Sequence, residues 1–222
     1  MVLKRALPVI PVARVTSPED VAARPFWTLA GVDGAPASEV SVSVSTRVRF
    51  AATAESFVIL FESTAEPPLT LERGDGEEVF RDECVELFLA SPDEPFAYDE
   101  FVVNPRGRLY MARIVNPDDS RETWSVSRGA RPAGISIGVT GDPRTRPATE
   151  WTRWSCRLTV PWSSLPSGHA PALLSRRRGN ATRIARGRST RFLALSPTLR
   201  AAPPDFHVPS RFARFVFGDA PA

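Results

Sequence analysis

The chain reads Val79-Phe-Arg-Asp-Glu-Cys-Val-Glu-Leu-Phe-Leu89 and, a few residues later, Tyr98-Asp-Glu-Phe-Val-Val-Asn-Pro-Arg-Gly-Arg-Leu109. Apolar and polar residues alternate in both stretches, and Pro and Gly occur between the alternating runs. This pattern is typical of short β-strands joined by turns. It predicts three consecutive strands, at residues 84–89, 101–103 and 109–114.

The alternation also sorts the side chains onto two faces, because successive residues of a strand point in opposite directions. Val85, Leu87 and Leu89 are predicted to enter the core, and the next strand would send Phe101 and Val103 the same way. The opposite face then carries Cys84, Glu86, Phe88, Tyr98, Glu100, Val102 and Asn104.

Similar short runs recur along the rest of the 222 residues, at 40–50, 57–61, 123–126, 135–139, 154–160, 192–195 and 212–217. With 22 prolines and no long helical period, the pattern predicts an all-β fold: a two-sheet antiparallel β-sandwich of jelly-roll or immunoglobulin-like type with little helix, one turn of it at 162–165. We expect one domain over residues 1–222. Residues 1–25 would wrap its outside, and residues 171–190 would form a long arginine-rich loop.

Composition excludes several classes of site. The two cysteines, Cys84 and Cys156, have no CxxC partner, so we expect two buried thiols and neither a zinc site nor a disulfide framework. His169 and His207 are the only histidines, which excludes a histidine-rich metal centre. We expect His207 to pair with Asp205 and tie the C-terminal segment to the sandwich.

The N-terminal stretch MVLKRALPVIPVARV is not typical of a signal peptide, because prolines and Arg14 interrupt its short apolar run. No apolar stretch is long enough for a membrane-spanning helix, so no membrane partner is expected. The compartment stays open between the cytoplasm and export by a route that the sequence does not show.

Charge is unevenly distributed. Residues 1–111 carry 10 basic and 18 acidic side chains, whereas residues 112–222 carry 18 and 7. The run 176–191 holds seven arginines and no acid, which is the footprint of a polyanion site. It has no interleaved aromatics for base stacking, so a solvated or acid-paired loop is favoured over nucleic-acid binding.

Glu86, Glu100 and Asn104 would offer carboxylates and an amide on one face of neighbouring strands, and sugar hydroxyls need such partners. The alternative is that the two acids are solvated or pair with Arg106 or Arg113. In that case, Asn104-Pro-Arg-Gly107 is only a turn.

Four motifs in order resemble the carbohydrate-binding module family 9-like, or DOMON-like, proteins. The two opening stretches are similar to that family's "VE-F" and "Y-EF-VNP-G" strands. Trp154-Ser-Cys-Arg-Leu-Thr-Val-Pro-Trp162 is similar to its "W…-IP(F/W)" strand. The last motif, Leu195-Ser-Pro-Thr198 with Pro204-Asp-Phe-His-Val-Pro-Ser-Arg-Phe212, resembles its closing "W-SP-T … DFH-P--FG" signature.

The resemblance implies a non-catalytic sandwich that holds a sugar, typically a chain end, between aromatic rings. By position, Phe80 replaces the usual platform Trp, Glu86 and Asn104 are polar contacts, and Asn180 opens a loop from which Asn180 or Arg183 would close the site. Two aromatics of the family pattern are missing, after Asn180 and at Leu195. We expect Trp124 to supply a replacement stacking surface.

The resemblance also implies a structural calcium ion, with Asp82 and Glu83, supported by Asp75, Glu77 and Glu78, as oxygen ligands. A solvated acidic loop is the alternative. No other cofactor is expected.

Two further functions compete with the binding module. In one, the sandwich has lost sugar binding and contacts an acidic partner through its arginine-rich loop. In the other, Glu86 and Glu100 act as a glycosidase pair, but neighbouring strands often place acids together without catalysis. The sequence therefore favours a carbohydrate-binding protein that is not an enzyme.

Overall fold

The computed structural model describes residues 6–41, 43–142 and 146–218. Short helical turns occur at Pro18–Ala23, Ala37–Val40, Val79–Arg81, Ala148–Glu150, Trp162–Ser164 and Pro209–Arg211. The strands are β1 Val9–Arg14, β2 Trp27–Thr28, β3 Ala30–Gly31, β4 Ser45–Ala52, β5 Ser56–Thr64, β6 Cys84–Ala90, β7 Ala97–Val103, β8 Leu109–Val115, β9 Ser125–Arg128, β10 Ser136–Gly141, β11 Arg153–Pro161, β12 Arg176–Arg186, β13 Thr190–Ala194 and β14 Ala213–Gly218. The all-β prediction is confirmed.

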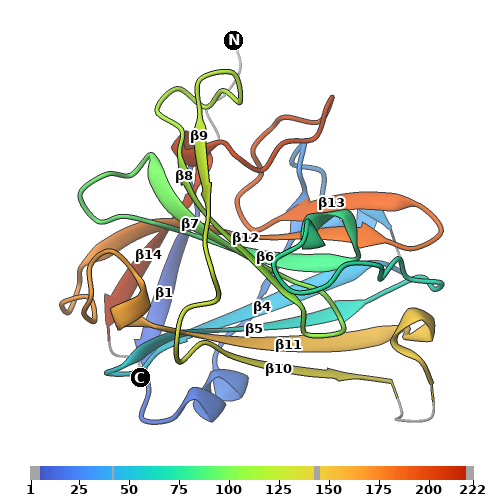
Figure 1. The fold of residues 1–222 in the computed structure, drawn as a ribbon, viewed down its shortest axis with the longest axis horizontal. Helices are drawn as coiled ribbons and strands as arrows, with labels where there is room; N and C mark the ends of the chain where they lie inside the picture. The colour runs from blue at the N-terminus through green and yellow to red at the C-terminus, as the bar shows by residue number, and fades with distance from the viewer. Residues whose placement is uncertain (1–5, 42, 143–145, 219–222) are drawn as a thin grey trace.

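The strands form two layers that are joined through β1 and β14. Their order is β10-β11-β5-β4-β1-β14-β12-β6-β7-β8-β9, with β13 beside β12. In Figure 1, β4, β5, β11 and β10 run together across the lower half, and β6 and β12 lie above them. The sheet thus curls back on itself, which gives the predicted β-sandwich.

The antiparallel prediction holds for most of the sheet but not for β1. This strand pairs in parallel with both β14 and β4. Residues 1–25 were predicted to wrap the outside of the sandwich, whereas β1 is an inner strand between two neighbours. Its VIPVAR sequence alternates imperfectly and contains Pro11, which hid a strand whose hydrogen bonds come only from distant segments.

Apolar side chains from both layers fill the space between them. Phe50 on β4 and Phe57 on β5 lie 4.9 and 5.7 Å, ring centre to ring centre, from Phe215 on β14. Leu87 and Phe101 belong to the same buried cluster. Burial of these large rings is the main source of stability in a sandwich of this kind.

The predicted sorting of faces on β6 and β7 is confirmed. Val85, Leu87, Leu89, Phe101 and Val103 lie in the core between the layers. Cys84, Phe88, Tyr98 and Val102 lie in a second apolar cluster on the other side of the sheet. Part of that second face is covered, because the C-terminal segment packs over it with Phe206 and Phe212.

The segment 171–190 is not the predicted loop. It contains β12, the longest strand, which pairs with β6, β13 and β14. Its sequence RRRGNATRIAR lacks an apolar alternation because both of its faces carry buried polar residues, among them Arg183 on one face and Thr182 on the other. The partners of these buried polar side chains come from distant parts of the chain. The strand was therefore missed by a prediction based on the alternation of apolar and polar residues.

Cys84 and Cys156 are free and buried, as predicted. None of the helices in the part of the chain that the structure describes is long and apolar enough to cross a lipid bilayer.

Candidate functional site

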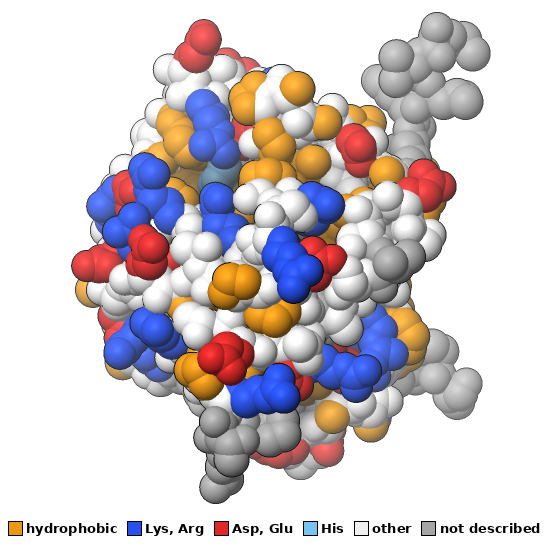
Figure 2. All heavy atoms as spheres, turned by 90° about the vertical axis from the view of Figure 1, so that its right-hand side faces the viewer, with side chains coloured by type: hydrophobic (Ala, Val, Ile, Leu, Met, Phe, Trp, Pro, Cys, Tyr) orange, Lys and Arg blue, Asp and Glu red, His pale blue; other side chains and the backbone are white. Residues whose placement is uncertain are grey.

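A cavity of about 390 Å³ opens on the second face of β6, β7 and β8, between β9, β13 and the C-terminal segment. Figure 2 shows a hollow on the corresponding side of the molecule, where a histidine lies between basic and hydrophobic side chains. The cavity is lined by Phe80, Glu86, Glu100, Tyr110, Ile114, Arg121, Trp124, Val126, Arg128, Ile184, Phe192, Pro204, Phe206 and His207. Four of the seven predicted site residues, Phe80, Glu86, Glu100 and Trp124, are therefore brought together.

Glu86 and Glu100 form the base of this cavity. In the antiparallel register Glu86 lies opposite Val102 and Phe88 opposite Glu100, so the two acids are diagonal neighbours on one face. Their exposed fractions are 2% and 4%. Thr182 on β12 donates a hydrogen bond to Glu86.

Burial raises the pKa of both carboxyl groups. The pKa of Glu86 rises to about 7, with the Thr182 hydrogen bond working against the rise. The pKa of Glu100 rises well above its usual range, first because of burial and then because of repulsion from Glu86. Ionising two neighbouring buried carboxyl groups at the same time costs much free energy, so the pair keeps a proton near neutral pH.

His207 lies beside this pair. Its Nδ1 is 3.0 Å from the Tyr98 hydroxyl, and its Nε2 is 3.6 Å from an oxygen of Glu100. Burial, followed by the charge of Arg121, lowers the pKa of His207 to about 3. The imidazole is therefore neutral near pH 7. Burial also raises the pKa of Tyr98, so its hydroxyl keeps a proton to donate to Nδ1.

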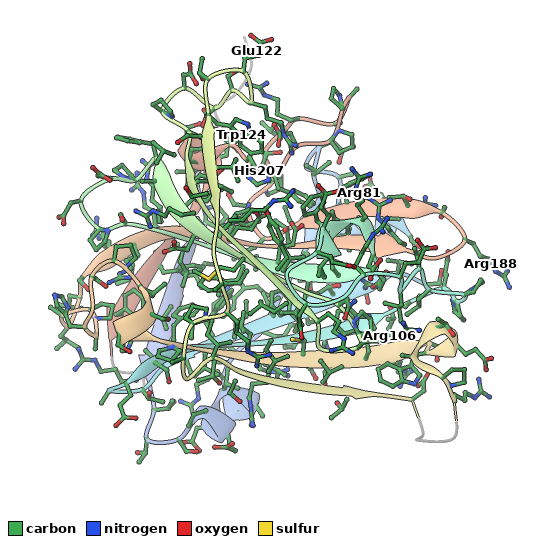
Figure 3. All side chains as sticks on the ribbon, viewed as in Figure 1. Arg81, Arg106, Glu122, Trp124, Arg188 and His207 are labelled. Atoms are coloured by element: carbon green, nitrogen blue, oxygen red, sulfur yellow. The ribbon has the colours of Figure 1, made fainter. Side chains whose placement is uncertain are left out.

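Aromatic rings surround the acids. Phe80, in the turn Val79–Arg81, meets Tyr110 edge to face with ring centres 5.3 Å apart. Trp124 meets His207 in the same way at 4.8 Å, and Figure 3 shows these two side chains close together near the start of β9. Phe192 and Phe206 complete the apolar lining, with ring centres 6.0 Å apart.

Two arginines border the cavity, and both already have acidic partners. Arg121 pairs with Asp205 at 2.7 Å and lies 5.0 Å from the centre of the Trp124 ring. Arg128 pairs with Glu78 at 3.0 Å. These ion pairs hold the guanidinium groups at the edge of the cavity rather than against the two buried acids.

Three predicted site residues lie elsewhere. Asn104 is fully buried, donates to Asp82 at 2.9 Å, and accepts from the backbone N–H groups of Arg106 and Arg108. It therefore forms the turn after β7, which was the alternative interpretation. Asn180 is also fully buried. Its side-chain amide donates to the backbone oxygen of Ser196 and accepts from the backbone N–H of the same residue.

Arg183 points to the core face of β12, opposite to its neighbour Thr182. It contacts Glu83 at 2.6 Å and donates to the backbone oxygens of Ser45 and Thr64. The sequence-based prediction placed it at the sugar. The alternation along β12 instead directs it into the space between the layers.

The acidic segment does not fit a calcium ion. Asp82 accepts hydrogen bonds from the backbone of Glu72 and Arg73, and Glu83 is bound to Arg183. Within residues 6–41, 43–142 and 146–218, no group of three or more His, Cys, Asp or Glu side chains could hold a metal. These carboxylates act as internal partners for protein donors.

The arginines of 176–191 do not gather into one surface. Arg177 and Arg183 are buried, and Arg188 lies at the tip of the β12–β13 hairpin, away from His207 (Figure 3). A single acidic partner could not contact all of them together. The structure thus gives no support to a single interaction surface formed by the whole arginine-rich run.

A second hollow, of about 430 Å³, lies on the outer face of β4, β5 and β11. It is slightly larger, but it is shallow and lined mainly by hydroxyl groups, Arg47, Glu62 and Arg153. Its single aromatic, Trp154, is 3% exposed. Its acid, Glu62, is already ion-paired with Arg49, and it has no accessible ring, so it is a weaker candidate for sugar binding.

Sequence reasoning missed several residues of the cavity, chiefly His207, Tyr110, Arg121, Phe192 and Phe206. His207 was predicted to tie down the C-terminal segment, and it does so: its backbone N–H donates to Asp205 and its carbonyl accepts from Asn116. Its position in the Asp205-Phe-His207 motif was the available signal. No local pattern shows that this segment folds over β7.

A comparison with protein families matches residues 29–217 to carbohydrate-binding family 9. The chain belongs to this family. No curated protein matches significantly.

Three solved structures share the family 9 fold of this chain. A candidate carbohydrate-binding protein from Bacteroides uniformis has a TM-score of 0.71 at 19% identity, covering 96% of this chain and 100% of that one. A carbohydrate-binding module of family 9 from Caldicellulosiruptor kristjanssonii, in complex with glucose, has a TM-score of 0.60 at 10% identity, covering 96% and 97%. The same organism's module with cellotriose gives 0.59 at 12%, covering 96% and 95%.

Proposed function

We propose that the cavity over β6, β7 and β8 binds one sugar ring of a glycan, as a binding site that performs no chemistry. Phe80 and Tyr110 would contact the ring on one side and Trp124 on the other. Glu86 and Glu100 would hydrogen-bond to its hydroxyls. The observation that carries the proposal is a pair of buried acids, incompletely partnered, at the base of an aromatic cavity.

The chemistry of a sugar matches both parts of this lining. The C–H groups of a pyranose need an apolar aromatic surface, and its hydroxyls need groups that donate and accept. Glu100 makes no hydrogen bond to the described residues, its nearest partner being His207 at 3.6 Å. A buried polar group without a partner is costly, so a ligand hydroxyl that reaches it gains binding free energy.

The electrostatics favour binding over hydrolysis. Glycosidases separate the pKa values of their two carboxyl groups, so that one is ionised while the other donates a proton. Here burial raises both pKa values, and the closest rim cation, Arg121, is bound to Asp205. Arg121 lowers the pKa of both acids less than burial raises it, so neither acid is held fully ionised as a nucleophile near neutral pH.

The test is calorimetric titration of the protein with glucose and cellotriose, the sugars in the two family 9 complexes from Caldicellulosiruptor kristjanssonii. We expect Glu86→Gln to lower the affinity about tenfold or more, since a hydrogen bond to a buried carboxyl is worth about 1.5–3 kcal/mol. Glu55→Gln, at an exposed position in the β4–β5 turn, is the control and should bind as wild type.

Two results would reject the proposal: wild-type protein that binds neither these sugars nor other neutral glycans on an array, or Glu86→Gln binding with unchanged affinity. Release of reducing sugar from cello-oligosaccharides by wild type but not by Glu86→Gln would show instead that the site is catalytic.

A further inference from the structure

A groove of about 370 Å³ lies where the start of β12 pairs with β14. It is lined by Ser91, Pro92, Pro95, Arg176, Arg177, Arg178 and Arg214. Four of these seven residues are arginines and none is acidic. The groove is distinct from the sugar cavity, with which it shares no residue.

The register of the two strands concentrates positive charge. Arg178 lies directly opposite Arg214, and Arg176 lies two residues earlier on β12, so that all three point to the same side of the sheet. Directly opposed residues are about 5 Å apart, and residues two apart on a strand about 7 Å. Like charges in such positions destabilise a sheet unless something compensates them.

Protein groups do not supply that compensation. Within the described residues Arg176, Arg178 and Arg214 form no ion pair, and Arg178 donates a single hydrogen bond, to the backbone oxygen of Pro209 at 3.5 Å. Arg177 differs, because its side chain is 5% exposed, donates to Ser167 and interacts with Asp99 and Asp93. Three guanidinium groups therefore remain available at the groove.

A tetrahedral oxyanion fits this arrangement. Guanidinium groups donate two parallel hydrogen bonds to sulfate or phosphate oxygens, and three of them within about 7 Å can surround one such group. The lining offers no aromatic ring for a nucleobase, so a nucleic acid would lose the stacking that supports its binding.

The groove also shares a sheet face with the sugar cavity. Arg178, Asn180 and Thr182 alternate to the same side of β12, and Thr182 donates to Glu86 at the base of that cavity. Four residues of extended strand separate the two sites by about 13 Å. The two sites are therefore close together but separate.

We propose that the groove of Arg176, Arg178 and Arg214 binds a sulfate or phosphate ester group of an anionic polysaccharide. The choice of a polysaccharide as the polymer rests on the proposed sugar-binding function. The anion site itself stands on the arginine geometry alone.

The experiment measures the affinity of the full chain for dextran sulfate, dextran phosphate and neutral dextran over a range of salt concentrations. The groove variant is Arg178→Gln with Arg214→Gln. The control removes the same charge from exposed positions outside the groove, Arg106→Gln with Arg188→Gln (Figure 3). Binding of dextran sulfate would identify a sulfate ester as the ligand, and binding of dextran phosphate would identify a phosphate ester.

We expect the groove variant to lose about tenfold or more in affinity for the charged dextran, with a shallower salt dependence, because fewer counterions are released. The control should change about twofold or less, and inorganic sulfate or phosphate should compete. The melting temperature of the groove variant should stay equal or rise, because a like-charge pair has been removed.

Equal losses in the groove variant and the control would overturn the proposal, since they would show a non-specific charge effect. Tighter binding of single-stranded oligothymidylate than of either charged dextran would overturn the polysaccharide assignment. Glu86→Gln separates the two sites: it should bind charged dextran as wild type does even where neutral sugar binding is lost. If Glu86→Gln also loses charged dextran, the groove is not an independent site.

Discussion

Glu83 and Glu86 are three residues apart, both are buried, and both face β12, yet their surroundings differ. Glu83 lies on the core side, where Arg183, the Trp154 indole N–H and the backbone N–H of Arg186 all donate to it. Glu86 lies on the other side, where Thr182 is its hydrogen-bond donor and an open cavity lies above it.

This difference separates a structural acid from one that is available to a ligand. A buried charge surrounded by donors holds strands together and has no capacity left for a ligand. A buried acid with a raised pKa at a cavity is typical of functional sites. Residue type and distance along the chain are nearly the same for both, so the surrounding donors decide the role.

Removing Glu83 should have the largest effect on the free energy of unfolding. Glu83→Ala leaves Arg183 as an uncompensated charge between the layers, and we expect a loss of about 3–5 kcal/mol in urea unfolding. Glu83→Gln combined with Arg183→Met should recover much of that loss. A loss below about 1 kcal/mol for Glu83→Ala would mean that water reaches Arg183 and would remove the contrast with Glu86.

The pH dependence of stability should distinguish the two acids next. The pKa of Glu86 is about 7 in the folded protein, against an ordinary value of 4.5. The stability linked to its bound proton is therefore fully present below pH 4.5 and is lost as the pH rises through 7. His207 acts oppositely: its pKa falls from 6.5 to about 3, so its contribution is present above pH 6.5 and is lost toward pH 3.

Urea unfolding at pH 5 and pH 8 measures this effect. Wild type should lose stability on the order of 2 kcal/mol more than Glu86→Gln between these two values, because the amide does not titrate. Glu55→Gln is the control and should follow wild type. Identical pH dependence of wild type and Glu86→Gln would show that the Glu86 carboxyl is solvated.

Trp124→Ala should have the smallest effect on the fold and a selective effect on the cavity. The ring is partly exposed, so the melting temperature should change little. Affinity for cellotriose should fall about tenfold, because one aromatic wall is removed. Phe26→Ala, at a ring that is 49% exposed and contacts Arg47, is the matched control. If both variants bind cellotriose with equal affinity, Trp124 is not part of the site.

The local pattern of the sequence predicted much of the framework. The strands at Cys84–Ala90, Ala97–Val103 and Leu109–Val115 and the two faces of Glu86 and Leu87 follow from a period of two, which depends only on backbone geometry. The polar strand β12 and the short β1 were missed, because pairing with distant segments and not local alternation makes them strands.

The amino-acid sequence by itself determined the family, the all-β class and the side of the sheet on which each acid lies. Only the tertiary structure decided which acid is bound to protein donors and which one faces a cavity. Arg183 reaches Glu83 across 100 positions, and His207 reaches Tyr98 across 109. The direction of a side chain is set by its own residue's backbone, whereas its partners come from segments that meet only when the sheet curls and the C-terminal segment closes over it.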